Sequence, residues 1–318
     1  MTKVAVTGGA GFIGSNLTLR LLSEGYEVVV VDDLSTGLLS SVDTSKSRFH
    51  QISITDSRML NTALNDCQTI FHLAARGSVP RSIMNPIATH EVNATGTLNV
   101  LEVARATGAH VIFSSSSSVY GRNLQLPKDE SMWLSPMTPY AASKLSAEGY
   151  VQAYSSAYNL PTTLLRFFNV FGPRQRPDHQ YAAVLPKWIW LAMQDKPIEV
   201  FGDGTASRDF TYIDTVVDIA MAAMTGRVTT LGAVNLAYGN RIFLSDAIDI
   251  LTKHFPTLEV VYKEERLGDV KESQNSPNLL NSLFPSVEPK PFEAALEETV
   301  NWLKHFGNSV ANGPKTID

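Results

Sequence analysis

A glycine-rich turn near the start of the chain constrains its fold more than any other segment. The apolar residues 4–6 precede the turn, TGGAGFIG occupies residues 7–14, and leucines at helical spacing follow. Glycine lets the backbone turn tightly and approach a phosphate closely, and the N–H groups at the start of a helix attract an anion. Taken alone, the motif also fits an ordinary strand-turn-helix corner. With its flanks, it predicts a strand and a helix joined by a turn that holds the diphosphate of a dinucleotide.

The second apolar segment, residues 26–31, ends in two carboxylates. Asp32 and Asp33 follow the glycines by about 20 residues, where a dinucleotide-binding fold presents a carboxylate to the adenosine ribose. A carboxylate there accepts hydrogen bonds from the ribose hydroxyls and repels an additional phosphate on the same ribose. The cofactor predicted from these residues is therefore NAD rather than NADP.

Short apolar segments alternate with helical stretches through the first half of the chain. This alternation is typical of an α/β fold with a Rossmann-type doubly wound parallel sheet. After residue 172, turns and prolines become frequent. We expect an NAD-binding domain over residues 1–172, with returning segments near 205–240, and a smaller, interleaved α/β substrate lobe over residues 173–318. Strands are predicted at residues 3–6, 27–31, 49–52, 69–73, 110–113 and 162–168.

Composition excludes several classes of protein. The formal net charge is −5 and the lysines and arginines are dispersed, which argues against nucleic acid as a partner. No segment is long and apolar enough to span a membrane, and the first strand begins too close to Met1 to leave room for a signal peptide. The single cysteine, Cys67, excludes an internal disulfide. From these observations we expect a cytoplasmic protein. We also expect no metal, because the histidines form no cluster with metal-ligand spacing.

Two further segments supply reactive groups. Five serines, residues 114–118, follow the apolar residues 111–113 and are expected at the carboxyl end of a strand, where α/β sheets bind ligands. Tyr140 and Lys144 share one face of a predicted helix. Tyrosine has an ordinary pKa of about 10, and a nearby ammonium group and a cationic nicotinamide ring both favour its phenolate. The pair is a candidate for general base catalysis, although Tyr and Lys occur at this spacing on many helices.

These segments resemble the extended short-chain dehydrogenase/reductase family, and within it the NAD-dependent nucleotide-sugar (UDP-hexose) 4-epimerases, over essentially the whole chain. The resemblance implies an isomerase that interconverts UDP-sugars through a transient 4-keto sugar and keeps NAD tightly bound. It rests on TGGAGFIG at 7–14, VDDLSTG at 31–37, HLAA at 72–75, SSSSSVYG at 114–121, YAASK at 140–144, RFFNVFGPRQ at 166–175, RDFTYIDT at 208–215 and RLGDV at 266–270.

The resemblance also assigns residues to the site. It implies Tyr140 as the catalytic base, Lys144 as the ribose anchor and Ser116 as the hydroxyl beside the reacting sugar oxygen. Along NAD, where Tyr140 and Lys144 also lie, it places Gly8, Gly11, Phe12, Ile13, Gly14, Asp32, Asp33, Leu34, Ser35, Thr36, Gly37, Ser53, Ile54, Leu73, Ala74, Ala75, Asn93, Ser114, Phe167 and Val170. Around the UDP-sugar it places Ser116 together with Arg81, Ser117, Asn169, Val184, Lys187, Glu199, Val200, Phe201, Arg208, Arg266, Asp269 and Ser273.

Guanidinium groups suit phosphate oxygens, so Arg208 and Arg266 would hold the diphosphate, and Asp269 the uridine ribose. Each arginine also fits a surface salt bridge. The chain departs from the family at Ser53, where an aspartate often holds the adenine, which leaves that contact open. It departs again at 76–77, where Arg-Gly follows HLAA and glucose-specific members often have a lysine beside the cofactor.

Ser117 and Ser118 separate related reactions. Dehydratases of the family have Asp-Glu directly before Val-Tyr-Gly and decarboxylases have a Glu there, because both reactions need a further acid or base. The two serines carry no such group, so we expect the 4-epimer as product. The alternative of a module that senses NAD without catalysis predicts the loss of Ser116, Tyr140 or Lys144, and all three are present.

The expected substrates are UDP-glucose and UDP-galactose. We also expect UDP-N-acetylglucosamine and UDP-N-acetylgalactosamine as substrates. In the family, the residue at the position of Ser273 borders sugar carbon 2, and a small side chain there leaves space for an acetamido group. The alternative is a uronic sugar, UDP-glucuronate or UDP-N-acetylglucosaminuronate, whose carboxylate Arg81 would approach; Arg81 fits a solvent-facing position equally well.

Two long helices are predicted at about residues 86–107 and 139–158, with apolar residues all round. Burial against their own sheet accounts for much of this apolar surface. The family resemblance adds a partner subunit, so we expect a homodimer built through a four-helix bundle.

Overall fold

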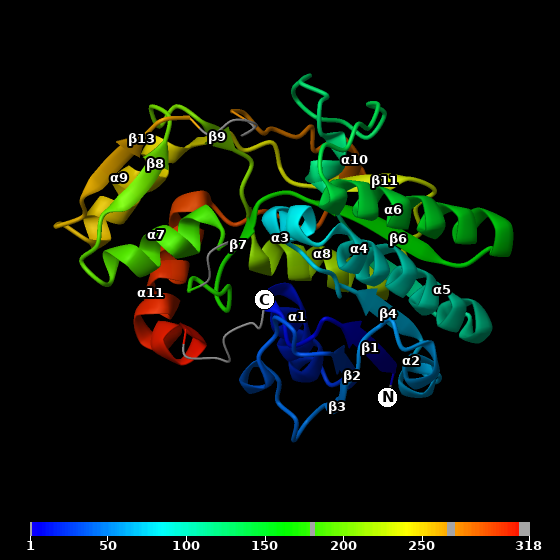
Figure 1. Cartoon of the computed structure of the whole chain (residues 1–318). Helices are drawn as coiled ribbons and strands as arrows, with labels where there is room; N and C mark the ends of the chain where they lie inside the picture. The colour runs from blue at the N-terminus through cyan, green and yellow to red at the C-terminus, as the bar shows by residue number, and fades with distance from the viewer. Residues whose placement is uncertain (1, 179–181, 266–270, 312–318) are drawn as a thin grey trace.

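The computed structural model describes residues 2–178, 182–265 and 271–311. Within these residues a seven-stranded, wholly parallel sheet organises the N-terminal half of the chain (Figure 1). The Rossmann-type fold predicted from the sequence is confirmed. In order across the sheet, the strands are β11 (Ala233–Leu236), β6 (Thr162–Phe167), β5 (His110–Ser116), β4 (Thr69–His72), β1 (Lys3–Thr7), β2 (Glu27–Asp32) and β3 (Arg48–Gln51).

The continuous valine run of β2 explains why helices cover both faces of the sheet. Val28 and Val30 pack in a core with α1 (Phe12–Ser23) and α8 (Ile213–Thr225). Val29 and Val31 pack in a second core with α5 (Gly96–Thr107) and α6 (Pro139–Tyr158). Successive side chains of a strand point to opposite faces, so an uninterrupted apolar run requires cover on both.

The two predicted long helices are present and begin at proline. The first consists of α4 (Pro86–His90), a π-helical turn (Glu91–Thr95) and α5, and the second is α6. The side chains of Asn85 and Thr138 cap the two starts, accepting hydrogen bonds from Ala88 N (3.1 Å) and Ala141 N (3.2 Å). Their outer sides are not uniformly apolar, because charged residues, Glu91, Glu102 and Arg105, are exposed. The shorter helices α2 (Ser57–Leu64) and α3 (Val79–Met84) pack on α5 and α6, respectively.

The strand order reverses between β1 and β4. From β1 the chain runs outward to β2 and β3, then crosses to β4 and continues to β5 and β6 on the other side. The connections after β1 and β4 therefore diverge, and a crevice opens at the carboxyl ends of these two strands, which is the ligand-binding position of doubly wound sheets. The glycine-rich turn follows β1, and residues 73–75 follow β4.

The second half of the chain forms a lobe at the left of Figure 1 and also contributes α8 and β11 to the sheet layer. Its core is continuous with the α1 side of the sheet, since Trp188, Ile198 and Leu296 belong to the same hydrophobic cluster as Val6. Its elements are β7 (Val170–Phe171), α7 (Val184–Ala192), β8 (Ile198–Phe201), β9 (Ser207–Arg208), β10 (Thr211–Tyr212), β12 (Ile242–Phe243), α9 (Leu244–His254), β13 (Val260–Lys263) and α11 (Phe292–Ala311). The short helix α10 (Asn278–Leu283) lies beside β11 instead.

Strand β5 is longer than its apolar residues predict. It extends through Ser116, because residues 114–116 pair with residues 165–167 of β6. Their side-chain hydroxyls are satisfied at the same time: Ser114 Oγ donates to His72 O (3.1 Å) and Ser115 Oγ donates to Glu148 Oε1 (2.5 Å). Polar residues can therefore continue a buried strand, which apolar patterning does not detect.

His72, at the end of β4, is buried in a chain of hydrogen bonds. Thr97 Oγ1 donates to Asn93 O (2.6 Å), so it accepts from His72 Nε2 (2.9 Å), and Thr7 Oγ1 donates to His72 Nδ1 (2.8 Å). This arrangement requires a neutral ring. Burial, and secondarily the Lys144 ammonium, lower the pKa of His72 from 6.5 to about 3.

We expect acid to destabilise the protein through His72. Its folded-state pKa lies below its unfolded value, so its contribution is complete above pH 6.5 and is lost as pH falls towards 3. Between pH 8 and pH 5 the loss is about 2 kcal/mol, from 1.36 kcal/mol per pKa unit. The free energy of unfolding, measured in urea, should fall from pH 8 to pH 5 in both proteins. The fall in His72→Gln should be smaller than the fall in wild type by about 2 kcal/mol. His305→Gln, at an exposed position of α11, is the control and should keep the pH dependence of wild type. Equal pH dependence in wild type and His72→Gln would contradict the expectation.

Candidate active site

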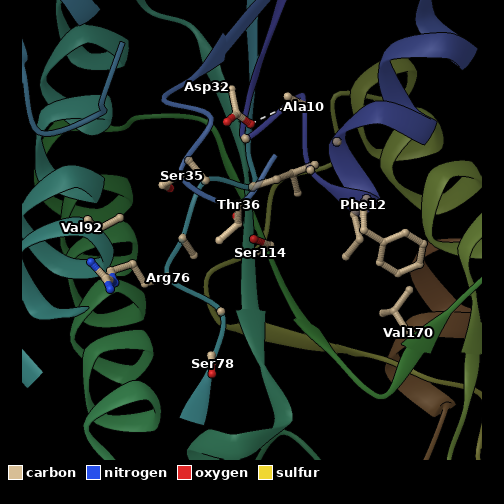
Figure 2. Close-up of a pocket in the computed structure, with 18 of the residues that line it drawn as sticks. Ala10, Phe12, Asp32, Ser35, Thr36, Arg76, Ser78, Val92, Ser114 and Val170 are labelled. Atoms are coloured by element: carbon tan, nitrogen blue, oxygen red, sulfur yellow. Dashed lines mark hydrogen bonds between the residues drawn. The ribbon is translucent and has the colours of Figure 1, made fainter. Parts of the chain in front are cut away.

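A cavity of about 610 Å³ occupies the crevice at the carboxyl ends of β1, β4 and β5 (Figure 2). Its volume lies in the range of ligand sites. Figure 2 shows Phe12 beside Val170, and Asp32 near Ser35 and Thr36. Residues expected at the site that line it are Gly8, Gly11, Phe12, Ile13, Gly14, Asp32, Asp33, Ser35, Thr36, Ile54, Leu73, Ala74, Ala75, Arg81, Ser114, Ser116, Tyr140, Lys144, Phe167, Asn169 and Val170.

The glycine-rich turn is closely packed against the segment after β4. Gly8 has φ +73°, and a Cβ on it would lie 2.7 Å from the Ala74 nitrogen. A Cβ on Gly14 would lie 2.2 Å from Gly8 O, so α1 can start this close to the turn only with glycine there. No side chain in the described part of the chain caps the start of α1 at Gly11. Its N–H groups therefore suit the diphosphate of a dinucleotide.

Asp32 lines the cavity and also fixes the backbone of two neighbouring loops by hydrogen bonds. Its two oxygens accept hydrogen bonds from Ala10 N (3.0 Å) and Leu34 N (2.8 Å), and burial raises the pKa of the carboxyl. A Cβ on Gly37 would lie 2.9 Å from Asp32 Oδ1, so Gly37 permits this packing. Each carboxylate oxygen has a second lone pair, which suits a ribose hydroxyl. These residues fit NAD without a 2′-phosphate.

Ser116, Tyr140 and Lys144 meet at the other end of the cavity. Lys144 Nζ donates to Ser114 O (2.8 Å), which anchors the ammonium at the end of β5. Burial lowers the pKa of Lys144 to about 8, so the group is still mostly protonated at neutral pH. Burial raises the pKa of Tyr140 above its ordinary value, and a hydrogen bond with the Ser116 hydroxyl offsets part of this increase. The arrangement can hold and transfer a proton at the Tyr140 hydroxyl.

A buried ion pair fixes the serine strand to α6. Arg166 Nε and a terminal nitrogen donate to the two oxygens of Glu148 (2.9 and 2.8 Å), and their side chains are 4% and 2% exposed. Glu148 follows Lys144 by one helical turn and also accepts from Ser115. The pair therefore sets the position of α6 relative to Ser114 and Ser116, because a fully hydrogen-bonded buried pair has one favourable geometry.

Asn93 lies beside the cavity rather than in its wall. It is 1% exposed, accepts from Arg76 N (2.8 Å) and donates to Ser143 Oγ (2.9 Å), which in turn donates to Tyr140 O (2.8 Å). Leu34, Gly37, Ser53 and Ser117 also lie outside the lining. Ser53 Oγ hydrogen-bonds Thr55 Oγ1 (2.8 Å), and its neighbour Ile54 fills the space that Gly96 leaves free.

The lobe residues expected around the nucleotide lie beyond this cavity. Val200 is fully buried in the core, so only its backbone is available to a ligand. Glu199 forms a long ion pair with Lys263 (3.9 Å), and Arg208 donates to Ser207 O and Lys271 O. The remaining members are Val184 and Lys187 on α7, Phe201 on β8, and Ser273, whose N–H donates to Ser207 O (3.1 Å). Arg266 and Asp269 lie outside the described residues.

Several lining residues were not identified from the sequence. Arg174 and Gln175 are the last residues of the motif at 166–175, and Arg176 follows it directly. Their place in the motif could have indicated that they lie at the site. Ser41, Ser78 and Val92 have no local signal, because their side chains reach the cavity only through the tertiary arrangement. The others are Ala10, Val31, Leu38, Ile52, Arg76, Gly77, Ser115 and Ala183.

The family model described as the NAD dependent epimerase/dehydratase family matches residues 4–237. The chain belongs to this family. Its predicted relationship to the extended short-chain dehydrogenases/reductases and its NAD cofactor are confirmed.

Members of the family similar to this chain act on different sugars. A UDP-glucose 4-epimerase of Mycolicibacterium smegmatis is 38% identical over 288 residues, 86% of this chain and 89% of the relative. A UDP-glucuronate 4-epimerase of Thermodesulfobacterium geofontis is 34% identical over 313 residues, 94% and 95% of the two chains. The solved structure of a UDP-N-acetylglucosamine 4-epimerase from Methanobrevibacter ruminantium M1, in complex with UDP-N-acetylmuramic acid, has a TM-score of 0.90 at 34% identity and covers 96% of this chain and 98% of that one.

Two features are absent from the described residues. None of their helices is long and apolar enough to cross a membrane. The same residues contain no group of three or more His, Cys, Asp or Glu side chains placed to hold a metal ion.

Proposed function

We propose that this chain is a UDP-sugar 4-epimerase that acts on UDP-glucose and UDP-galactose, and also on UDP-N-acetylglucosamine and UDP-N-acetylgalactosamine. The observation that carries the proposal is one cavity lined by the glycine-rich turn, Ser116, Tyr140 and Lys144. The absence of a carboxylate at Ser117 and Ser118 favours epimerisation over elimination or decarboxylation. The similar proteins named above support the class of substrate.

The chain's own residues supply proton transfer and orientation. Tyr140 takes the proton from the hydroxyl on sugar carbon 4 and later returns it, while Ser116 hydrogen-bonds the same oxygen. Lys144 holds the ribose beside the nicotinamide and keeps a positive charge near Tyr140, which favours the phenolate. NAD, when bound, accepts the hydride of the carbon 4 and gives it back. Rotation of the 4-keto sugar between these steps yields the other epimer.

A uronic sugar is the second candidate, and Arg81 favours it. Arg81 lies on α3, lines the same cavity as Tyr140, and follows the cap at Ser78, whose Oγ accepts from Arg81 N (3.3 Å). A guanidinium there suits the carboxylate of UDP-glucuronate or UDP-N-acetylglucosaminuronate. The relative from Thermodesulfobacterium geofontis supports this reading.

A substrate panel without added NAD tests the proposal. The purified chain is incubated with the gluco and galacto forms of UDP-hexose, UDP-N-acetylhexosamine and UDP-hexuronate, and the products are separated by chromatography. Conversion of the first two classes supports the main proposal, and conversion of the uronates alone supports the alternative. Failure to convert all three would refute both.

We also propose the two-part organisation. Residues 1–172 and the returning segments near 205–240 hold NAD, and residues 173–318 hold most of the UDP-sugar.

We propose a cytoplasmic location as well. The buried Cys67 thiol, whose pKa burial raises to about 11, is unreactive and fits this location. Fractionation of cells that express the tagged chain tests the location; recovery outside the cytoplasm would contradict it.

The Tyr140→Phe variant should lose turnover by about 10²–10⁴-fold, the typical effect of removing a general base, while it retains NAD and UDP. Initial rates and UDP binding by calorimetry measure the two effects. Tyr262→Phe, at an exposed position of β13 outside the cavity, is the matched control. Turnover near wild type in Tyr140→Phe would assign the base to another group, Ser116 first.

The Ser273→Tyr variant should discriminate against acetylated sugars. A tyrosine that fills the space at sugar carbon 2 costs about 1–3 kcal/mol, which lowers kcat/KM for UDP-N-acetylglucosamine about 10- to 100-fold and that for UDP-glucose much less. Ser282→Tyr, on exposed α10, is the control. An unchanged ratio of the two kcat/KM values would show that Ser273 does not border the sugar.

We further propose a homodimer in which α4–α5 and α6 pack against their symmetry mates as a four-helix bundle. Ile87, Tyr150 and Tyr158 expose 71%, 38% and 54% of their surface on these helices, and the helices pack on each other. Light scattering should give the mass of two chains. A monomer mass at all concentrations, with full activity, would exclude the bundle.

A further inference from the structure

Arg174 occupies a strained backbone position at the edge of the cavity. It has φ +71°, in the left-handed region that favours glycine, directly after β7. Two hydrogen bonds hold its turn: Asn16 Nδ2 on α1 donates to Pro173 O (3.0 Å), and Gln175 Nε2 donates to Val170 O (3.2 Å). A non-glycine residue in this conformation at a ligand site indicates that its side chain has a role there.

The side chain of Arg174 joins two loops that are distant in the sequence. Its guanidinium donates to Ser41 O (3.1 Å), at the end of the loop that follows β2. Arg174 and Ser41 both line the cavity, together with Gly11 and Phe12 of the turn expected to hold the diphosphate. The contact therefore closes the rim between the second half of the chain and the loop that carries Asp33, Ser35 and Thr36.

No carboxylate in the described part of the chain balances the charge of Arg174. Burial lowers the pKa of the guanidinium, and no acidic group of the described residues counteracts this effect. Its neighbour Arg176, in contrast, pairs with Asp178 (3.0 Å), and the buried Arg166 pairs with Glu148. A partly buried cation without a nearby counter-charge is unfavourable, and a guanidinium has five N–H donors, so the site favours an anionic ligand.

We propose that Arg174 binds the diphosphate of NAD from the side opposite the glycine-rich turn and, through Ser41, fastens the loop of residues 33–41 over the cofactor. The inference rests on the proposed function, because an epimerase regenerates NAD in every cycle and gains from keeping it bound. Arg174 then acts by retaining the cofactor, and it takes no part in proton transfer.

The test compares two arginine-to-glycine variants of the NAD-loaded protein. Arg174→Gly removes the guanidinium and relieves the backbone strain. Arg227→Gly is the matched control, because Arg227 also has a positive φ (+46°) but is exposed and lies outside the cavity. A chase with labelled NAD measures the dissociation rate, and thermal unfolding of the NAD-stripped proteins measures their stability.

We expect NAD to dissociate about 10- to 100-fold faster from Arg174→Gly, the usual effect of losing a charged hydrogen bond, while the stripped protein melts no lower than wild type. Arg227→Gly should release NAD at the wild-type rate. Arg174→Lys, which keeps the charge without the planar fork, should fall between wild type and Arg174→Gly.

The possible outcomes separate this inference from the proposed function. Wild-type retention of NAD by Arg174→Gly overturns the inference alone. Faster release that is accompanied by an equal loss of stability in the stripped protein also overturns it, because Arg174 then has a structural role only. Wild-type protein that binds no NAD refutes the proposed function instead.

Discussion

The close approach of the glycine-rich turn to the segment after β4 is the constraint on which the site depends. Gly8 leaves no room for a side chain against the Ala74 backbone, and Gly14 leaves none against Gly8. These contacts bring the start of α1 to the mouth of the crevice between β1 and β4. Gly11, Asp32 and the Tyr140–Lys144 pair then line one cavity.

Buried polar groups below the cavity hold its two ends in register. His72 links the end of β1 to α5 through Thr7 and Thr97, and Asn93 continues this path to Ser143 and the Tyr140 carbonyl. The Glu148–Arg166 pair ties α6 to β5 and β6. Breaking one of these bonds leaves an unsatisfied group in a low-dielectric interior, so the network resists small shifts of Tyr140 relative to Ser116.

Sugar specificity is decided by parts of the molecule that the shared chemistry does not fix. Ser116, Tyr140 and Lys144 line one end of the cavity, and the names of relatives of similar identity give UDP-glucose for one and UDP-glucuronate for another. We propose that side chains around carbons 2 and 5 of the sugar make this difference, with Ser273 and Arg81 as the candidates.

The sequence by itself determined the Rossmann-type fold and the NAD cofactor, because each depends on short segments whose backbone conformation is local. Glycines set a turn, uninterrupted apolar runs set strands with two covered faces, and a four-residue spacing puts Tyr140 and Lys144 on one helix face. The tertiary structure decided what those segments meet. Ser41 and Arg174 are 133 positions apart, and Asn93 and Ser143 are 50 apart, so no local pattern joins them. Such contacts exist because the strand order brings distant loops to the same crevice. Burial there makes an unpaired charge or polar group unfavourable, so these groups form hydrogen bonds with each other.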